Sequence, residues 1–264
     1  MKAAALFDVS GKAALVTGAA SGLGLAITEV LADNGARVAM LDVDGESLEK
    51  AAARLKQAGG DVLARIVDVA DTKGLAAIMA EVARSFGRLD IAFANAGMSA
   101  GPGYATEAGQ LANVNSLDWQ RVLDVNLSGV FATLQAASIP MKAQKSGRII
   151  VTASIAGLRA EKPVGYAYAA TKAAVINLVR QASRELAPYN VLVNAIAPGP
   201  FFTHIAGGRL HRDPAVVKMF EDMVPLGRIA RPEEIQGLAL FLASGASSYV
   251  TGTVIPIDGG ITAG

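Results

Sequence analysis

The sequence predicts an α/β fold: a doubly wound parallel sheet of about seven strands, with helices on both faces. Short apolar runs rich in Val, Ile and Ala alternate with longer stretches of helical periodicity, as expected for strands buried on both faces and joined by crossover helices. The 264 residues match the length of one such unit, and no internal repeat or linker divides them. Cysteine is absent, so the core has to form without disulfides. We therefore expect a single domain over residues 1–264.

Seven short apolar runs are the expected strands. They are Ala13–Thr17, Arg37–Leu41, Val62–Val67, Ile91–Ala94, Arg148–Thr152, Val191–Ile196 and Thr253–Ile257. Helices are expected between them at about 22–34, 45–58, 72–86, 117–141, 167–187 and 232–243, with a short one near 213–223. Two segments fit neither pattern, residues 98–115 and residues 198–225. Because loops beyond the carboxyl ends of parallel strands surround the ligand crevice, we expect both to be substrate loops.

The first expected strand runs into a glycine-rich turn, and a helix begins directly after it. Residues 17–24 read Thr-Gly-Ala-Ala-Ser-Gly-Leu-Gly. Gly18 suits the tight turn, Gly22 allows close approach to a pyrophosphate, and Gly24 allows the helix to pack on the strand. The helix N-terminus offers free N–H groups and a positive dipole end to phosphates. An ordinary glycine-rich turn is the alternative to a Rossmann-type dinucleotide site. The contacts expected at that site are Gly18, Ser21, Gly22, Leu23 and Gly24.

A carboxylate, Asp42, ends the second expected strand eighteen residues after Gly24, where it can reach the ribose hydroxyls of an adenosine. The 2′-phosphate of NADP would meet this carboxylate, and like charges about 4 Å apart repel by on the order of 4 kcal/mol at an effective dielectric near 20. Residues 19–21 and Val43 supply no cation. The alternative that Asp42 only starts a turn leaves its spacing from the glycines unexplained. We expect NAD as the cofactor.

Tyr168 and Lys172 are four residues apart in an expected helix and therefore lie on one face of it. Alone, such a pair is usually a packed ring beside a solvated amine. To carry a proton near pH 7, a tyrosine needs its pKa lowered from about 10, and a lysine ammonium and an oxidised nicotinamide both have the required charge. Ser154, at the end of the fifth expected strand, can hydrogen-bond a substrate oxygen. Tyr166, six residues before Lys172, is expected to face elsewhere.

Together these motifs resemble the short-chain dehydrogenase/reductase family over residues 11–260. The catalytic tetrad that the resemblance implies is Asn126, Ser154, Tyr168 and Lys172. Asn126, in the run Asp124–Leu127, is implied to support a water and the lysine, and Asn95 is implied to support the sheet, although Ala94 stands where a second Asn is common. The further cofactor contacts that the resemblance implies are Asp68, Val69, Asn95, Ala96, Gly97, Tyr168, Lys172, Pro198, Gly199 and Thr203.

Two features depart from the family pattern. The spacing of 14 residues from Ser154 to Tyr168 is about one more than the resemblance leads us to expect, and residues 98–115 form a longer segment than is usual. Both differences are expected to affect the choice of substrate more than the chemistry.

The expected function is therefore NAD-dependent interconversion of a secondary alcohol and a ketone, with Tyr168 as the proton shuttle. A second enzyme function is reduction of a 3-oxoacyl thioester, which normally favours NADPH, and Asp42 argues against it. A third alternative, from a different class, is a non-catalytic dinucleotide-binding protein on the same fold. The intact Ser154, Tyr168 and Lys172 argue against that alternative.

Composition and charge limit the other partners. A formal net charge of +1, with no long basic run, makes nucleic acid an unexpected partner. Gly252 and Pro256 break the longest uncharged stretch, Ile235–Ile257, which excludes a spanning helix there. Only five apolar residues separate Lys2 from Asp8, too few for a signal peptide. We expect a soluble, cytoplasmic protein with no membrane partner.

The histidine inventory bears on metals and on substrate charge. With no Cys and only two His, the usual zinc sites are excluded and no metal is expected. The second loop carries His204, Arg209, His211 and Arg212. These residues could receive an anionic group, although a solvated charged lid is the more ordinary interpretation.

The long expected helices at 117–141 and 167–187 stay apolar on faces that the sheet does not cover, and residues 125–141 carry no formal charge. Exposed apolar patches usually mark contacts. The family resemblance implies a homotetramer of two-fold symmetry that pairs these helices and the last strands. A monomer whose loops cover the helices is the alternative.

Overall fold

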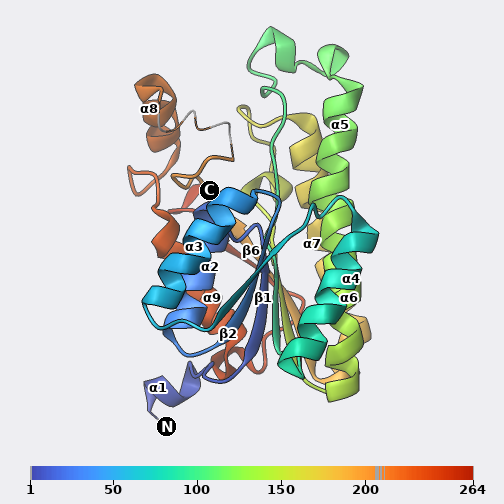
Figure 1. Cartoon of the computed structure of the whole chain (residues 1–264). Coiled ribbons are helices and arrows are strands. Elements are labelled where there is room, and N and C mark those ends of the chain that lie inside the picture. Colours follow the sequence, from blue (N-terminus) through green and yellow to red (C-terminus); the bar gives the residue numbers. More distant parts are fainter. Residues whose placement is uncertain (1, 206–207, 209, 211, 264) are drawn as a thin grey trace.

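A computed structural model describes residues 2–205, 208, 210 and 212–263, and shows one seven-stranded sheet in which all neighbouring strands are parallel (Figure 1). The spatial order is β3-β2-β1-β4-β5-β6-β7. The strands are β1 (Ala13–Thr17), β2 (Arg37–Asp42), β3 (Val62–Ile66), β4 (Ile91–Ala94), β5 (Gly147–Thr152), β6 (Val191–Pro198) and β7 (Val254–Ile257). The order reverses between β1 and β4, which opens a crevice at their carboxyl ends. The predicted fold class is confirmed.

Helices cover both faces of the sheet. They are α1 (Ala3–Leu6), α2 (Gly22–Asp33), α3 (Gly45–Gln57), α4 (Thr72–Phe86), α5 (Ser116–Leu123), α6 (Gly129–Gln144), α7 (Tyr166–Leu186), α8 (Pro214–Met223) and α9 (Gln236–Ala243). Apolar side chains of α2, α3 and α9 pack on one face, and those of α4, α6 and α7 pack on the other (Figure 1). The sheet is therefore buried between two layers, which explains its continuous apolar strands.

Several strand predictions were wrong by one or two residues at their ends. Strand β2 continues to Asp42 because that residue pairs with Ile66, the last residue of β3. Strand β6 continues to Pro198, which pairs with Ile257 of β7. The predicted bounds that change are Arg37–Leu41, Val62–Val67, Arg148–Thr152, Val191–Ile196 and Thr253–Ile257. These ends depend on pairing with a neighbouring strand, which an isolated apolar run does not encode.

Helix bounds shift by similar amounts. The helices predicted at 22–34, 45–58 and 167–187 end one residue earlier, and the last of these begins at Tyr166. The short helix predicted at 213–223 begins at Pro214, because Asp213 is its N-cap. The helix predicted at 232–243 starts with a 3₁₀ turn, Pro232–Ile235, before α9. The short helix α1 was not predicted.

The helix predicted at 117–141 is longer and irregular. It comprises α5, a π-helical turn at Asp124–Ser128, and α6, which contains Pro140. In the part of the chain that the structure describes, this run is the one helix long and apolar enough to span a membrane, and half of its most apolar window is buried inside the protein. It packs as a core helix against the sheet. The π turn matters for the site because it carries Asn126.

Residues 98–115 project beyond the carboxyl ends of the strands, as does α8 (Figure 1). Two 3₁₀ turns, Glu107–Gly109 and Leu111–Asn113, give this segment structure that was not predicted. It packs closely on the chain that precedes α7, because a Cβ placed on Gly103 would lie 2.1 Å from the carbonyl oxygen of Lys162. Only a glycine fits there, so the two segments hold each other in place.

Candidate active site

A cleft of about 530 Å³ opens at the carboxyl ends of the central strands, where the strand order reverses. Every residue that the sequence analysis assigned to cofactor binding lines it. Of the expected catalytic tetrad, Ser154, Tyr168 and Lys172 line the cleft as well, and Asn126 does not. The fold thus brings together residues that lie up to 185 positions apart in the chain, from Gly18 to Thr203.

The glycine-rich turn forms one wall of the cleft. Gly18 and Gly22 have φ angles of +68° and +52°, in the region that favours glycine. A Cβ on Gly24 would lie 1.9 Å from the carbonyl oxygen of Gly18, so the start of α2 packs directly on the turn. A Cβ on Gly22 would lie 3.3 Å from Thr203 Cγ2, which brings the loop after β6 over the turn. A close approach of backbone to a phosphate group is possible only with such residues.

Asn95 ties the ends of three strands together. Its side-chain amide donates to the carbonyl of Thr17 at 3.0 Å, and its side-chain oxygen accepts from the hydroxyl of Thr152 at 3.0 Å. The hydroxyl of Thr17 accepts from the backbone N–H groups of Asn95 and Ala96, both at 3.0 Å. These bonds fix the ends of β1, β4 and β5 around the floor of the cleft.

Asp42 is held at the end of β2 by backbone groups. Its Oδ2 accepts from the N–H of Ala20 at 2.9 Å, and its Oδ1 accepts from the N–H of Asp44 at 3.0 Å. The carboxylate therefore stands beside the glycine-rich turn in a fixed orientation. Val43, next to it, is 63% exposed and contributes no charge.

Asp68 lines the same end of the cleft and is paired with a cation that the sequence analysis missed. Arg121, on α5, donates to Asp68 Oδ2 at 2.9 Å. The backbone N–H of Ala70 and this guanidinium lower the pKa of Asp68 below its usual range, against the opposing effect of burial. Arg121 lies 53 residues after Asp68 in the sequence, so no local sequence pattern predicts this ion pair.

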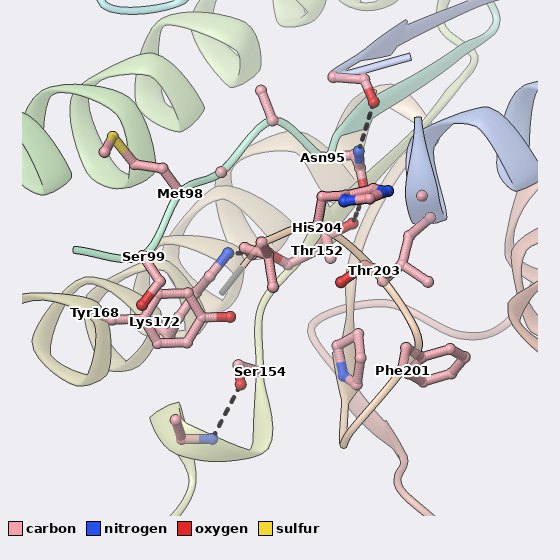
Figure 2. A pocket seen from close by; sticks show the side chains of 18 of the residues that line it. Asn95, Met98, Ser99, Thr152, Ser154, Tyr168, Lys172, Phe201, Thr203 and His204 are labelled. Carbon is pink, nitrogen blue, oxygen red and sulfur yellow. Dashed lines mark hydrogen bonds between the residues drawn. The ribbon is translucent and has the colours of Figure 1, made fainter. Parts of the chain in front are cut away.

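Tyr168, Ser154 and Lys172 lie together on the opposite side of the cleft from Phe201 and Thr203 (Figure 2). Lys172 is only 2% exposed, and its Nζ donates to the carbonyl of Thr152 at 2.7 Å. Burial lowers the pKa of Lys172 to about 8. The ammonium lies 5.5 Å from the centroid of the Tyr168 ring.

The phenol of Tyr168 sits in a protected position. Burial raises its pKa, and a side-chain hydrogen bond with Ser154 acts in the opposite direction with a smaller effect. Proton transfer near pH 7 requires a lowered pKa of Tyr168. The protein alone does not lower it. Ser154 is itself oriented by the N–H of Ala156, which donates to its Oγ at 3.2 Å.

Asn126 lies behind the wall of the cleft. It is fully buried, and its side chain accepts from the N–H of Met98 and donates to the carbonyl of Met98, both at 2.8 Å. A Cβ on Gly97 would lie 3.5 Å from both Asn126 Oδ1 and Lys172 Nζ. Asn126 therefore fixes the backbone that follows β4. Only Gly97 separates its side chain from the ammonium of Lys172.

The other residues singled out from the sequence divide into three groups. Tyr166 is 38% exposed and pairs with Tyr104, with ring centroids 6.5 Å apart, so it does not face the cleft. His204 lines the cleft, whereas Arg212 lines a separate shallow depression beside α8. Arg209 and His211 lie outside the described residues.

Comparison with known proteins agrees with this geometry. The model of a family described as enoyl-(acyl carrier protein) reductase matches residues 18–262. Cyclohexanol dehydrogenase of Rhodococcus sp. (strain TK6) is 41% identical over 273 residues, which cover 96% of this chain and 96% of the relative. The chain belongs to the short-chain dehydrogenase/reductase family.

Two further members of the family show its range. The 3-oxoacyl-(acyl-carrier-protein) reductase FabG of Thermotoga maritima is 36% identical, and the match covers 96% of this chain and 98% of the relative. The crystal structure of a gluconate 5-dehydrogenase from Burkholderia cenocepacia J2315, in complex with NADP and tartrate, is 33% identical, with a TM-score of 0.91 over 100% of both chains. This short-chain dehydrogenase/reductase is accordingly an NAD(P)-dependent oxidoreductase that acts on alcohols and ketones.

The sequence analysis predicted two substrate loops but did not single out most of the individual residues that line the substrate end of this dehydrogenase/reductase. One of them, Glu161, is a buried carboxylate. The others are mostly apolar side chains from loops and from α8, namely Met98, Ile155, Val164, Phe201, Ile205, Leu210, Phe220, Met223 and Ile261. Phe220 and Met223 lie on α8, and the others come from irregular segments in which no periodicity singles out a lining residue.

Proposed function

We propose that the protein is an NAD-preferring dehydrogenase that interconverts a secondary alcohol and its ketone. The observation that carries the proposal is that Tyr168, Ser154 and Lys172 lie together in the cleft that the glycine-rich turn also lines. A substrate oxygen bound by Ser154 and Tyr168 would place the adjacent carbon toward the loop Pro198–Thr203.

The chain's own residues carry the proton. In alcohol oxidation, the Oη of Tyr168 takes the hydroxyl proton of the substrate, and Ser154 hydrogen-bonds the same oxygen. For this transfer the pKa of Tyr168 has to fall, and positive charge beside the phenol, from Lys172 and from an oxidised nicotinamide, lowers it. The dinucleotide, when bound, supplies the hydride acceptor.

Asn126 has a positioning role in this proposal. It fixes the backbone of Met98 through two hydrogen bonds and lies behind Gly97, next to the buried ammonium of Lys172. It orients the wall on which the lysine rests and does not touch the reacting atoms. This agrees with the supporting role, toward a water and the lysine, that the family resemblance implies for Asn126.

The dinucleotide would lie across the crevice where the strand order reverses, between β1 and β4. Its phosphates would approach the turn Gly18–Gly24, where the φ angles and the missing Cβ atoms leave room for them. Asp42 would accept hydrogen bonds from the adenosine ribose, and Asp68 and Val69 would flank the adenine. The nicotinamide end would rest against the residues after β4 and β6. The contacts proposed there are Asn95, Ala96, Gly97, Pro198, Gly199 and Thr203, with Tyr168 and Lys172 at the ribose.

The expected preference is at least about tenfold for NAD over NADP in kcat/KM, because the fixed carboxylate of Asp42 would repel a 2′-phosphate. Steady-state rates with each cofactor measure it. Asp42→Ala should narrow the gap mainly by improving the use of NADP. Asp44→Asn is the matched control, since it removes a nearby charge and keeps an oxygen that can cap α3. Equal use of both cofactors by the unaltered enzyme would contradict the proposal.

The substrate end favours a compact, largely apolar alcohol. The apolar residues at this end, among them Phe201, Phe220 and Met223, support this proposal, as does the similarity to cyclohexanol dehydrogenase. We propose a screen of NAD reduction over cyclic alcohols, polyols, sugar acids and aryl carbinols. Turnover of a secondary alcohol in this screen would support the function.

A second candidate is reduction of a 3-oxoacyl thioester, which the similarity to the Thermotoga reductase supports. It requires NADPH in the usual case, and the position of Asp42 disfavours it. Turnover of an acetoacetyl thioester with NADPH, faster than any alcohol with NAD, would favour this candidate. Stoichiometric binding of NADH with no turnover of either class would instead indicate a non-catalytic dinucleotide-binding protein.

We further propose that residues 1–264 act as one domain in the cytoplasm, without a metal ion, nucleic acid or membrane as partner. Residues 98–115 and 198–225 serve as its substrate loops. Support comes from their positions at the cleft, where Met98, Ser99 and residues of the second loop form part of the wall.

Assembly as a homotetramer is the expected result of light scattering at micromolar concentration, with a mass about four times that of the 27.0 kDa chain. On α6, Phe131 and Ile139 are 51% and 69% exposed and lie on one face, and no described strand pairs with the outer edge of β7. Phe131→Glu should shift the mass toward a dimer. A mass near that of one chain for the unaltered protein would show that these surfaces are not used.

A further inference from the structure

Glu161 is a buried carboxylate at the substrate end of the cleft. It takes no part in the proton transfer or the dinucleotide binding proposed above. It is 6% exposed and lines the cleft. Its Oε1 is buried and accepts no hydrogen bond. A buried carboxylate is unfavourable unless hydrogen bonds or a positive charge compensate for the loss of water around it.

The one charged neighbour of this oxygen that the structure pairs with it is Arg159. Its Nε lies 3.0 Å from Oε1, without the alignment of a hydrogen bond. The guanidinium is also engaged elsewhere, because its Nη1 donates to the carbonyl of Ile261 at 2.7 Å. The Arg159 side chain is 43% exposed, so its charge is partly screened by water. The ion pair thus occupies the buried Oε1, whereas Oε2 accepts no hydrogen bond from the described residues and is the oxygen left for a group in the cleft.

The segment that carries Glu161 is held firmly. The N–H of Val164 donates to the carbonyl of Glu161 at 3.1 Å. The next residues pack against Gly103 so closely that a Cβ there would meet the carbonyl of Lys162 at 2.1 Å. A Cβ on Gly165 would lie 3.0 Å from the carbonyl of Ala100. A rigid support of this kind is what a specificity residue requires.

The surroundings of Glu161 are otherwise poor in charge. Among the cleft-lining residues that the structure describes, Asp42, Asp68 and Arg121 belong to the end beside β2 and β3, and Lys172 is buried against Tyr168. His204 is the other ionisable group that lines the loop side. Burial raises the pKa of the Glu161 carboxyl, while the charge of Arg159 acts in the opposite direction. A hydrogen-bond donor that entered this region would be strongly favoured over an apolar group.

We propose that Glu161 selects the substrate: its carboxylate accepts a hydrogen bond from a second hydroxyl group, so that the enzyme prefers diols to mono-alcohols and disfavours substrates that carry a carboxylate. The proposal rests on the alcohol dehydrogenase function proposed above. A site with a buried polar group rejects an analogue that lacks the partner, because the group is then left unpaired. A substrate carboxylate would bring a like charge next to a buried one.

The test uses two variants with the holoenzyme at pH 8. Glu161→Leu removes both the acceptor and the charge, and Glu161→Gln keeps an acceptor and removes only the charge. The substrates are cyclohexanol, the three cyclohexanediols and 4-hydroxycyclohexanecarboxylate. We expect the ratio of kcat/KM for the best diol to that for cyclohexanol to fall by about tenfold or more in Glu161→Leu and to stay within about threefold in Glu161→Gln. Glu161→Gln should raise kcat/KM for the hydroxycarboxylate by about tenfold.

Arg159→Gln is the matched control, because it breaks the ion pair and leaves Glu161 in place. It should keep the preference for diols. If Glu161→Leu, Glu161→Gln and Arg159→Gln lowered thermal stability alike and left every substrate ratio within about twofold of the unaltered enzyme, Glu161 would be only a counterion and the proposal would be overturned.

Binding measurements separate this inference from the function on which it rests. Dissociation constants for the same alcohols are measured by calorimetry on Tyr168→Phe saturated with NAD, alone and combined with each Glu161 variant. If the unaltered enzyme oxidised no alcohol, the proposed function would fail. The ratio of the constants for diol and cyclohexanol would still test Glu161, and a ratio that does not change in Glu161→Leu would overturn its role.

Discussion

Tyr168→Phe is expected to lower kcat by about a hundredfold or more, while the variant still binds NADH. The substitution keeps the ring and its packing and removes the hydroxyl group that carries the proton. Steady-state kinetics with a substrate found in the screen measures kcat, and fluorescence titration measures the dissociation constant of NADH. Because Phe fills the same space, no loss of folding is expected to obscure the result.

Tyr166→Phe is the control for that prediction. Tyr166 lies on the same helix, packs against Tyr104 and faces away from the cleft, so its hydroxyl group has no part in the reaction. Turnover should stay within about twofold of the unaltered enzyme. If Tyr166→Phe abolished turnover and Tyr168→Phe did not, the assignment of the proton carrier would be wrong.

Short-range spacing was enough to predict the parts of the site that one strand-to-helix connection contains. Gly18, Gly22 and Gly24 are placed by a single turn, and Asp42 follows from the length of the next helix and strand. The parallel, doubly wound sheet could be predicted from the alternation of strands and helices, whereas the strand order was not predicted, because the connection from β3 to β4 crosses the sheet instead of joining neighbouring strands. The family resemblance supplied the residues that lie further along the chain.

The parts that the sequence did not predict depend on contacts between distant segments. Arg121 reaches Asp68 across 53 positions, and Glu161 lines the cleft from a segment whose next residues pack against Gly103. The π turn that carries Asn126 is another feature that the sequence did not predict. Periodicity reports which face of a helix is apolar. It does not report which loop packs on it.

Lys172 has opposite effects on stability and activity. It is 2% exposed, and burial lowers its pKa to about 8, against about 10.4 in an unfolded chain. The native state therefore binds the proton more weakly than the unfolded state does. Below pH 8 the charged lysine destabilises the native state by about 3 kcal/mol, and this effect is relieved as pH rises from about 8 to about 10.5.

Lys172→Met is expected to remove this pH dependence together with most of the activity. Met fills similar space and does not titrate, so the free energy of unfolding of the unaltered protein minus that of the variant should rise by about 2 kcal/mol between pH 7 and 9.5. Urea unfolding of the cofactor-free protein, at one protein concentration, measures this difference. At pH 7 turnover should fall by about a hundredfold, because the positive charge that lowers the pKa of Tyr168 is lost. Lys56→Met, at an exposed position on α3, is the control and should change neither quantity. A difference that stays flat with pH would mean that Lys172 does not titrate near 8, and its charge would then be present throughout the range in which the enzyme works.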